Sequence, residues 1–414
     1  MYKLEVKLKQ HTPMIHFQHD QEGATLRATE VKPKLDRFII KKVFSDDFDV
    51  VKEFLIGYDS KKPNAQKEKF NKGYYALDYK MRIESDSIDR YTIPDRYSLY
   101  FGNMGDNNQR KEFTFCKGLT SIVIYSFHIE LRDLIEKHVY EFFLLNNFGS
   151  RQSKGFGSFY IDKESSASLY KAPLKTGIMD YRFKVSVSGD IFNQWRILFE
   201  HIELFYKILR SGINICNRNG ESVFYMKSMM FKYAKKEGFQ WDKKSIKEKY
   251  YPHILKEQKE EHDDEDIADV LHFEQKNGKK YLFKDLLGLS STENWRAPYN
   301  KMITKESVTK EIERFKSPII FKPIRIEGKN VYNVLFKGTE IPKKFLNKDF
   351  KIKDGKREDL KLTTYPEFDI NDFLDYSIFD VDLEELVGDE DYLDHPKFKT
   401  LENMFNQIRT DYGL

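Results

Sequence analysis

The sequence predicts an α+β protein of two domains, each with strands and helices in the order β-α-β-β-α-β. Three observations carry this prediction. The chain has 414 residues, which is more than one hydrophobic core usually supports. Within residues 1–165, apolar side chains recur first with the spacing of a strand and then with that of a helix, in the order given. A second series of the same kind opens at residue 181.

The first domain is predicted over residues 1–165. Residues 3–10 alternate apolar and charged side chains as a half-buried strand does, and a helix follows with Pro33 as its first residue. The other expected elements are strands over 74–83 and 119–127, a helix over 132–145 and a last strand that closes at Ile161. This is the ferredoxin-like, or RRM-like, arrangement, in which two helices cover one face of a four-stranded antiparallel sheet.

The second domain is predicted over residues 166–414 as a degenerate copy of the same fold. Its expected elements are a strand over 181–189, a helix over 195–209 and a hairpin over 317–338. A large, mainly helical insertion is expected at about 222–316, and the last strand of the fold is not identifiable. The chain closes with an acidic tail over 365–414, which ends in a helix after Pro396.

Charge is distributed unevenly along the chain. Residues 365–414 hold 14 Asp and Glu against 3 Lys and Arg, a net charge of −11. Because the whole chain carries +4, residues 1–364 carry +15. Such a body can attract a polyanion. The acidic tail is expected to face a basic partner, to stay solvated, or to occupy the chain's own polyanion-binding groove until the polyanion displaces it.

The composition excludes several classes of protein. Apolar residues make up 40% of the chain and charged residues 33%, as in folded rather than disordered proteins. There is no run of about 18 apolar residues and no apolar region of a signal peptide, so a cytoplasmic protein without a membrane partner is expected. Cys116 and Cys216 are too few for a disulfide framework or a thiolate cluster. Neither a metal nor a cofactor is expected.

A glycine-rich loop at residues 149–157 is the most informative motif. Gly149, Gly155 and Gly157 alternate with Arg151 and Lys154 between a helix end and a strand. Glycines let a backbone approach a ligand closely, and exposed amides beside two cations suit phosphate oxygens. A plain glycine-rich turn explains the spacing equally well. The loop is neither a nucleotide P-loop nor a dinucleotide fingerprint, because it precedes a strand rather than a helix.

A second basic set lies in and around the first helix. Lys34, Arg37 and Lys41 are three and four residues apart, so they share one helical face that can follow successive phosphates. The whole set is Arg27, Lys32, Lys34, Arg37, Lys41 and Lys42.

Together, these segments resemble the RAMP superfamily (repeat-associated mysterious proteins). The resemblance rests on the first strand followed by HTPM, the basic helix and the terminal GSRQSKGFGSF. In the second domain, LRSGINICNRNG, LFKDLLGLSSTENWR and ERFKSPIIFKPIRI resemble the family of two-domain first subunits of the Cmr complex, the type III-B CRISPR effector.

The resemblance implies a subunit without catalytic activity that contacts guide RNA, near its 3′ end, and target RNA. Other RAMP subunits of the complex are the implied protein partners. The implied contacts to the guide backbone are Arg27, Lys32, Lys34, Arg37, Lys41, Arg151 and Lys154, with Gly149, Gly155 and Gly157 shaping the loop.

Two other functions compete with this interpretation. The loop after the first strand contains His11, His16, His19 and Asp20. Imidazoles can move protons in metal-independent RNA cleavage, so an endoribonuclease is the alternative, with His16, His19 and Asp20 as its catalytic candidates. No second acid or base is identifiable for it. A scaffold that binds only proteins would leave the charge of +15 unexplained, and its binding to RNA would depend little on salt.

Overall fold

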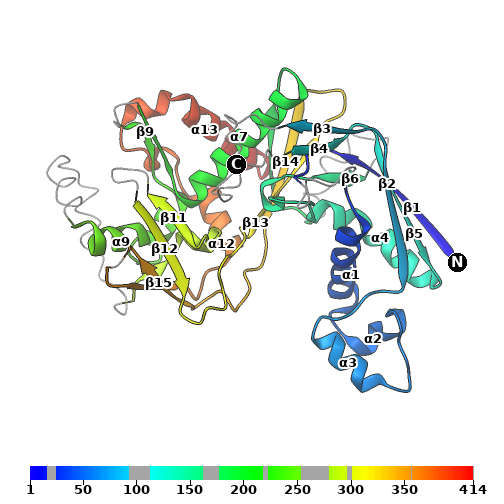
Figure 1. The fold of residues 1–414 in the computed structure, drawn as a ribbon. Helices are drawn as coiled ribbons and strands as arrows, with labels where there is room; N and C mark the ends of the chain where they lie inside the picture. The colour runs from blue at the N-terminus through cyan, green and yellow to red at the C-terminus, as the bar shows by residue number, and fades with distance from the viewer. Residues whose placement is uncertain are drawn as a thin grey trace. The chain divides into compact units, whose positions relative to one another are not determined.

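The computed structural model describes residues 1–15, 25–92, 112–161, 177–217, 222–252, 279–295, 301–355 and 357–413 (Figure 1). It divides into two compact units. The first unit is formed by Met1–Phe199 with Phe321–Phe336, and the second by Glu200–Ile320 with Lys337–Leu414. The sequence placed the domain boundary at residue 165. In the structure, residues 177–199 and 321–336 belong to the first compact unit.

A four-stranded antiparallel sheet forms the centre of the first unit. Its strands are β1 (Tyr2–Gln10), β2 (Tyr79–Ser85), β5 (Leu119–Ser126) and β6 (Phe159–Ile161), in the order β2-β5-β1-β6. Helices α1 (Ala28–Phe44) and α4 (Ile129–Leu145) pack on one face of the sheet (Figure 1). The order of strands and helices is therefore the one predicted for residues 1–165.

The core of this unit follows the alternation in the sequence. Leu4, Val6 and Leu8 of β1 are buried, while the residues between them are exposed. They form one apolar cluster with side chains from both helices, including Leu35 of α1 and Ile135 of α4.

Helix α1 begins five residues earlier than predicted. Arg27, in an extended conformation, precedes its first residue, Ala28, and Pro33 lies inside the helix. A proline inside a helix removes one backbone hydrogen bond, and the packing of Val31, Leu35 and Ile39 in the core offsets that loss.

Smaller elements complete the first unit. They are α2 (Phe48–Val51), η1 (Lys52–Phe54), α3 (Pro63–Asn71) and the hairpin of β3 (Ile88–Thr92) and β4 (Glu112–Cys116). Trp195, near the start of α7 (Ile191–Arg210), is fully buried against Phe113 and Phe115 of β4.

A three-stranded sheet contains the strand and the hairpin that were predicted for the second domain. Its order is β13-β14-β7, with β7 at Tyr181–Ser186, β13 at Ile319–Arg325 and β14 at Val331–Gly338. The predicted strand at 181–189, helix at 195–209 and hairpin at 317–338 are confirmed by these strands and α7. A fourth strand is absent from this sheet among the described residues.

The second unit is built around a five-stranded sheet in the order β10-β16-β15-β12-β11. The strands are β10 (Tyr281–Leu282), β11 (Thr292–Trp295), β12 (Lys301–Ser307), β15 (Asp349–Lys353) and β16 (Leu360–Thr364). Only the β10–β16 pair is parallel. Beside the sheet are the hairpin β8–β9 (Ile213–Cys216 and Ser222–Met226) and helices α8 (Met229–Lys236) and α9 (Asp242–Tyr250).

The segment 222–316 was predicted to be mainly helical, and its described part mixes helices with strands. Helices α8 and α9 and the short η4 (Lys284–Leu287) lie in it together with strands β9 to β12. The charged stretch that suggested a long helix lies within residues 253–278, outside the described residues. In β12, exposed Met302 is followed by buried Ile303, and this alternation is typical of a strand.

The acidic segment 365–414 is part of the folded second unit rather than a separable tail. It contains α12 (Ile370–Asp375), the single turns η5, η6 and η7 (Tyr376–Asp380, Glu384–Leu386 and Glu390–Asp394) and α13 (Pro396–Asp411). The helix predicted after Pro396 is thus confirmed. Leu401 and Phe405 of α13 are fully buried, and Arg409 donates to the carbonyls of Ile378 and Val381 at 2.7 and 2.8 Å. A segment that supplies core side chains cannot be displaced by RNA without unfolding, so the expectation of a displaceable tail is wrong.

Candidate nucleic-acid interface

The glycine-rich loop connects the end of α4 to β6, and its glycines are required by close approaches within the chain. Gly149 and Gly157 have φ values of +77° and +65°. A side chain at Gly149 would meet the carbonyl oxygen of Ile15 at 2.6 Å, and one at Gly157 would meet that of Phe148 at 1.9 Å. Gly155, with φ of +88°, ends the single turn η2 (Gln152–Lys154). The glycines therefore let the loop close on its own backbone.

The amides of the three glycines donate within the protein. The amide of Gly149 donates to Oε1 of Glu30 at 2.8 Å, that of Gly155 to the carbonyl of Gln152 at 3.2 Å, and that of Gly157 to the carbonyl of Pro13 at 2.9 Å. The prediction that these amides are exposed to phosphate is wrong, because Glu30 of α1 and the segment after β1 already satisfy two of them and the turn satisfies the third.

Lys34 joins the basic helix to the glycine-rich loop. Its Nζ donates to Oε1 of Gln152 at 3.0 Å and to the carbonyl of Asn147 at 3.3 Å, and it pairs with Glu30 at 3.2 Å. It also lies 4.7 Å from the ring centroid of Phe148. The two motifs that the sequence singled out separately therefore meet at one place.

Beyond Lys34, the same face of α1 carries two exposed cations. Arg37 and Lys41 are both exposed, and Arg37 Nε donates to the carbonyl of Pro33 at 3.2 Å. In the loop, Arg151 and Lys154 are half-buried on either side of Gln152, and Arg27 is half-buried before α1. Basic side chains thus extend from the loop along α1.

Two other predicted cations of this helix are committed to internal contacts. Lys32 does not lie on the helical face that carries Lys34, Arg37 and Lys41. Its Nζ pairs with Asp36 at 2.8 Å and donates to the carbonyl of Leu77 at 2.9 Å. It also lies 4.1 Å from the ring centroid of Tyr79. Lys42 pairs with Glu141 of α4 at 2.7 Å. The structure does not bring Lys32 to the face that carries Lys34 and Arg37.

The residues that directly follow β1 hydrogen-bond to the glycine-rich loop. Thr12 Oγ1 donates to the carbonyl of Gly155 at 2.6 Å and accepts from the amide of Ser158 at 2.9 Å. His11 is buried, and its Nδ1 accepts from the amide of Arg325 at 3.0 Å. Burial lowers the pKa of His11 to about 3, so it is neutral at physiological pH and acts as a structural residue.

This buried histidine predicts a loss of stability in acid. Between pH 6.5 and about 3, His11 binds a proton in the unfolded chain but not in the folded one, so stability falls as the pH falls through this window. From pH 6.5 to 5 the loss should be about 2 kcal/mol, or roughly 4–8 °C in Tm. In His11→Asn, whose side-chain oxygen can still accept from Arg325, this component should disappear. Thermal unfolding of both proteins at the two pH values measures it, and equal losses would contradict the assignment.

A buried lysine completes the support of the loop, and sequence reasoning missed it. Lys322 of β13 is fully buried, and its Nζ donates to the carbonyls of Asn146 at 2.9 Å and Phe159 at 2.7 Å, at the two ends of the loop. Burial holds the pKa of Lys322 well below its ordinary value. The only signal in the sequence is a lysine inside the apolar run of a strand.

The residues of the alternative catalytic site, His16, His19 and Asp20, lie outside the described residues. The last described residue before them, Ile15, accepts from the amide of Ser150 at 2.7 Å.

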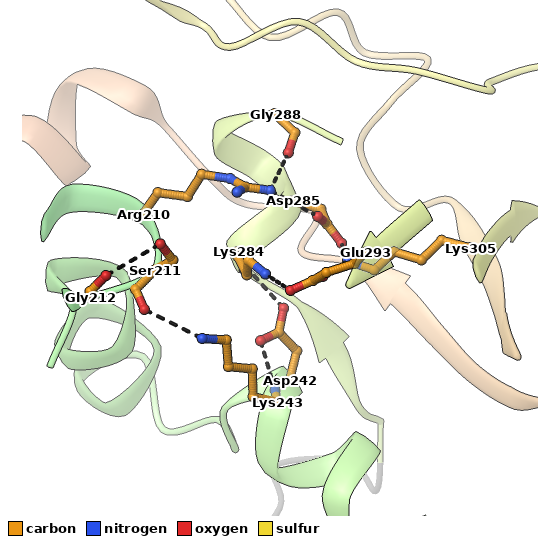
Figure 2. A network of polar contacts seen from close by, with 10 residues as sticks. All are labelled: Arg210, Ser211, Gly212, Asp242, Lys243, Lys284, Asp285, Gly288, Glu293 and Lys305. Atoms are coloured by element: carbon orange, nitrogen blue, oxygen red, sulfur yellow. Dashed lines mark hydrogen bonds and ion pairs between the residues drawn. The ribbon is translucent and has the colours of Figure 1, made fainter. Parts of the chain in front are cut away.

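A second cluster of charged groups lies in the second unit (Figure 2). Lys305 Nζ lies 2.5 Å from Asp285 and 2.9 Å from Glu293, and Glu293 also binds Lys284. Burial raises the pKa of Asp242 to about 6 and lowers that of Lys284 to about 8. Asp285 is fully buried and Lys305 is 2% exposed, so no substrate reaches these two groups, and we assign their ion pair a structural role.

The described residues offer neither a metal site nor a membrane span. No group of three or more His, Cys, Asp or Glu in this part of the chain could hold a metal ion. No helix among these residues is long and apolar enough to cross a bilayer.

Comparisons with known proteins give consistent matches. A family model described as the Cmr1 N-terminal domain matches residues 1–213, and one described as the Cmr1 C-terminal domain matches residues 225–396. The chain is similar to the crystal structure of Cmr1 from Pyrococcus furiosus in its apo form, with 15% identity, a TM-score of 0.36, and coverage of 83% of this chain and 90% of that one. A cryo-EM structure of the Type III-B Cmr-beta bound to cognate target RNA matches with 14% identity, a TM-score of 0.25, and coverage of 39% and 58%. No curated protein matches.

Proposed function

The chain belongs to the Cmr1 family, and from that membership we propose that it is a non-catalytic, RNA-binding subunit of a type III-B CRISPR effector complex. It holds guide RNA, in its 3′ region, and target RNA, together with other RAMP subunits in the cytoplasm. Sequence is then read by base pairing between the two RNAs, and the protein supplies backbone contacts. The observation that carries the proposal is the junction of the basic helix with the glycine-rich loop through Lys34.

We infer that side chains rather than loop amides make the phosphate contacts, because the amides of the three glycines donate within the protein. Lys34 is fixed by Glu30 and Gln152, so it orients the loop. Arg37 and Lys41, which are exposed on the same helical face, point outward for phosphates. Arg27 and Arg151 extend this surface along the loop. Lys154 is left out of it, because its Nζ atom is buried. Lys32 is excluded from it, because its ammonium group is held between Asp36 and the ring of Tyr79.

The fold supports the same proposal. We infer that the sheet β2-β5-β1-β6 with α1 and α4 is a ferredoxin-like domain, because its strand order and helix positions are those of a split βαβ arrangement. We also infer that β7, α7, β13 and β14 are a degenerate copy that lacks the fourth strand. Such folds host many functions, so the functional claim depends on the family and on the basic surface.

A salt-titrated binding assay with labelled single-stranded RNA tests the proposal. The pair Arg37→Ala/Lys41→Ala removes two cations from the surface, and the control pair Lys343→Ala/Lys344→Ala removes two exposed cations elsewhere. We expect the first pair to flatten the slope of log affinity against log salt by about 1.4, since each phosphate contact of a single strand contributes about 0.7. The control pair should leave the slope unchanged. Equal slopes for both pairs would contradict the assignment of the surface.

A cleavage gel run on the same samples distinguishes a non-catalytic RNA-binding subunit from an endoribonuclease. If the wild-type protein cleaves RNA and His19→Ala does not, the protein is an enzyme and the proposal of a non-catalytic subunit is wrong.

A further inference from the structure

Among the residues that the structure describes, no helix or strand covers the second face of the four-stranded sheet over β1, β2 and β5. The side chains that alternate with the core residues are exposed on β1 (Lys3, Glu5, Lys7) and on β2 (Lys80, Arg82, Glu84). On the strand between them, β5, the residues of this face are half-buried by those neighbours, and they are Leu119, Ser121, Val123 and Tyr125. This surface is called the open sheet face below.

Tyr125 lies between two lysines on the open sheet face. In the strand register, Lys3 of β1 and Lys80 of β2 are its direct partners on either side. Directly paired side chains in a sheet have Cβ atoms about 4.5–5.5 Å apart. Among the described residues Tyr125 has no ring neighbour and no hydrogen bond, so one side of its ring is available to a ligand.

The charges of the open sheet face favour an anion. It carries four cations, Lys3, Lys7, Lys80 and Arg82, against two carboxylates, Glu5 and Glu84. Each carboxylate is paired on its own strand, Glu5 with Lys3 at 3.1 Å and Glu84 with Arg82. Lys7 and Lys80 have no ion pair with any described residue. Lys80 therefore remains uncompensated directly beside Tyr125. Lys7 remains uncompensated opposite Ser121, four residues or about 13 Å further along the strand.

We propose that the open sheet face is a second RNA-binding surface, in which one base of a single strand stacks on Tyr125 and the adjacent phosphates contact Lys7 and Lys80. Aromatic side chains that stack bases beside cations that follow the backbone are the usual means of holding single strands. A duplex hides its base faces and cannot use the ring. This inference extends the proposed function, because it takes RNA as the ligand and adds a contact apart from α1 and the glycine-rich loop.

A protein partner fits this face less well. The centres of protein interfaces are depleted of lysine, and the apolar side chains here form one narrow row along β5 between two charged strands. Ser121 lies between Leu119 and Val123 in this row, so it interrupts the apolar area further.

The test separates stacking from charge in the full-length protein. Tyr125→Ala should weaken binding of a labelled single-stranded RNA by about 5- to 150-fold, the range expected for the loss of one base stack, with the salt slope unchanged. Tyr125→Phe keeps the ring and should bind within about twofold of wild type, which would show that the ring and not the hydroxyl is required. Lys7→Ala/Lys80→Ala should instead flatten the salt slope by about 1.4. A duplex RNA of equal length should not distinguish Tyr125→Ala from wild type.

Wild-type affinity for single-stranded RNA in Tyr125→Ala would overturn the inference. If Arg37→Ala/Lys41→Ala still loses affinity in that case, the proposed function stands and only the second surface is wrong. Loss of co-purification with other complex subunits, with RNA affinity kept, would also overturn it and would identify the face as a protein contact.

Discussion

Gly157→Ala is expected to destabilise the first unit by about 2–5 kcal/mol and to disrupt the glycine-rich loop. The added methyl group would lie 1.9 Å from the carbonyl oxygen of Phe148 and 2.8 Å from its carbonyl carbon. These are backbone atoms, so no side-chain rotation relieves the clash. Residue 157 also has a φ of +65°, which costs a residue with a Cβ about 1–2 kcal/mol by itself. Overpacking adds about 1–3 kcal/mol.

The loop cannot easily shift away from the clash. The amide of Phe148 donates to the carbonyl of Gly157 at 3.0 Å, and the amide of Gly157 donates to the carbonyl of Pro13 at 2.9 Å. Moving residue 157 by enough to accommodate a methyl group breaks one or both of these bonds. It would also move Ser158, which donates to the carbonyl of Pro323 at 2.7 Å.

Gly57→Ala is the matched control, because Gly57 has a φ of +69° but nothing within 4 Å of the added methyl group. It carries the same left-handed cost without the clash. We expect the Tm to fall at least twice as far in Gly157→Ala as in Gly57→Ala, and RNA affinity to fall only in the former. Equal drops in Tm would show that the backbone conformation, and not the contact with Phe148, requires glycine at position 157.

Helix and strand positions in the first domain were predictable because their apolar periodicity is strong. The orientation of α1 was harder to predict. From the sequence alone, either Lys32 or Lys34 could lie on the side of the helix that faces the core. Asp36 decides this: it is buried, and it draws Lys32 inward as its ion-pair partner. An ion pair between residues four apart is visible in the sequence, but its burial is not.

The residues that hydrogen-bond to the glycine-rich loop from other segments could not be predicted, for a different reason. Lys322, Glu30 and the backbone amide of His11 all hydrogen-bond to the loop or its flanks from far away in the sequence. No local pattern connects residues that are more than a hundred positions apart. The loop amides were predicted to bind phosphate, because the sequence does not show that the carboxylate of Glu30 and the carbonyl of Pro13 accept hydrogen bonds from them.

Lys305→Met is expected to destabilise the second unit by about 3–5 kcal/mol, the usual cost of breaking a buried ion pair. The ammonium group of Lys305 lies between Asp285 at 2.5 Å and Glu293 at 2.9 Å, and it is 2% exposed (Figure 2). Burial alone would lower the pKa of Lys305, but these two carboxylates raise it above its ordinary value. Methionine has a similar length, so the variant removes the charge and leaves little cavity.

The cost arises because the carboxylates left behind remain buried. Asp285 would keep only Arg210, whose Nη2 lies 3.5 Å from it in the present structure, as a cationic partner. Glu293 would keep Lys284, and burial lowers the pKa of Lys284 to about 8, which makes it a weaker partner above that pH. Burial also raises the pKa of the neighbouring Asp242 to about 6, so this site already disfavours carboxylates without partners.

A double-mutant cycle isolates the pair from the other charges. Asp285→Asn alone should also be destabilising, whereas Lys305→Met/Asp285→Asn should lose less than the sum of the two single variants, with a coupling of about 1–3 kcal/mol. Lys353→Met is the control on the same sheet, because Lys353 pairs with Glu306 at 2.6 Å in an exposed position and its loss should cost at most about 1 kcal/mol. Denaturant unfolding of the four variants measures these values. If Lys305→Met were no more destabilising than Lys353→Met, the buried network would contribute no more to the second unit than an exposed ion pair does.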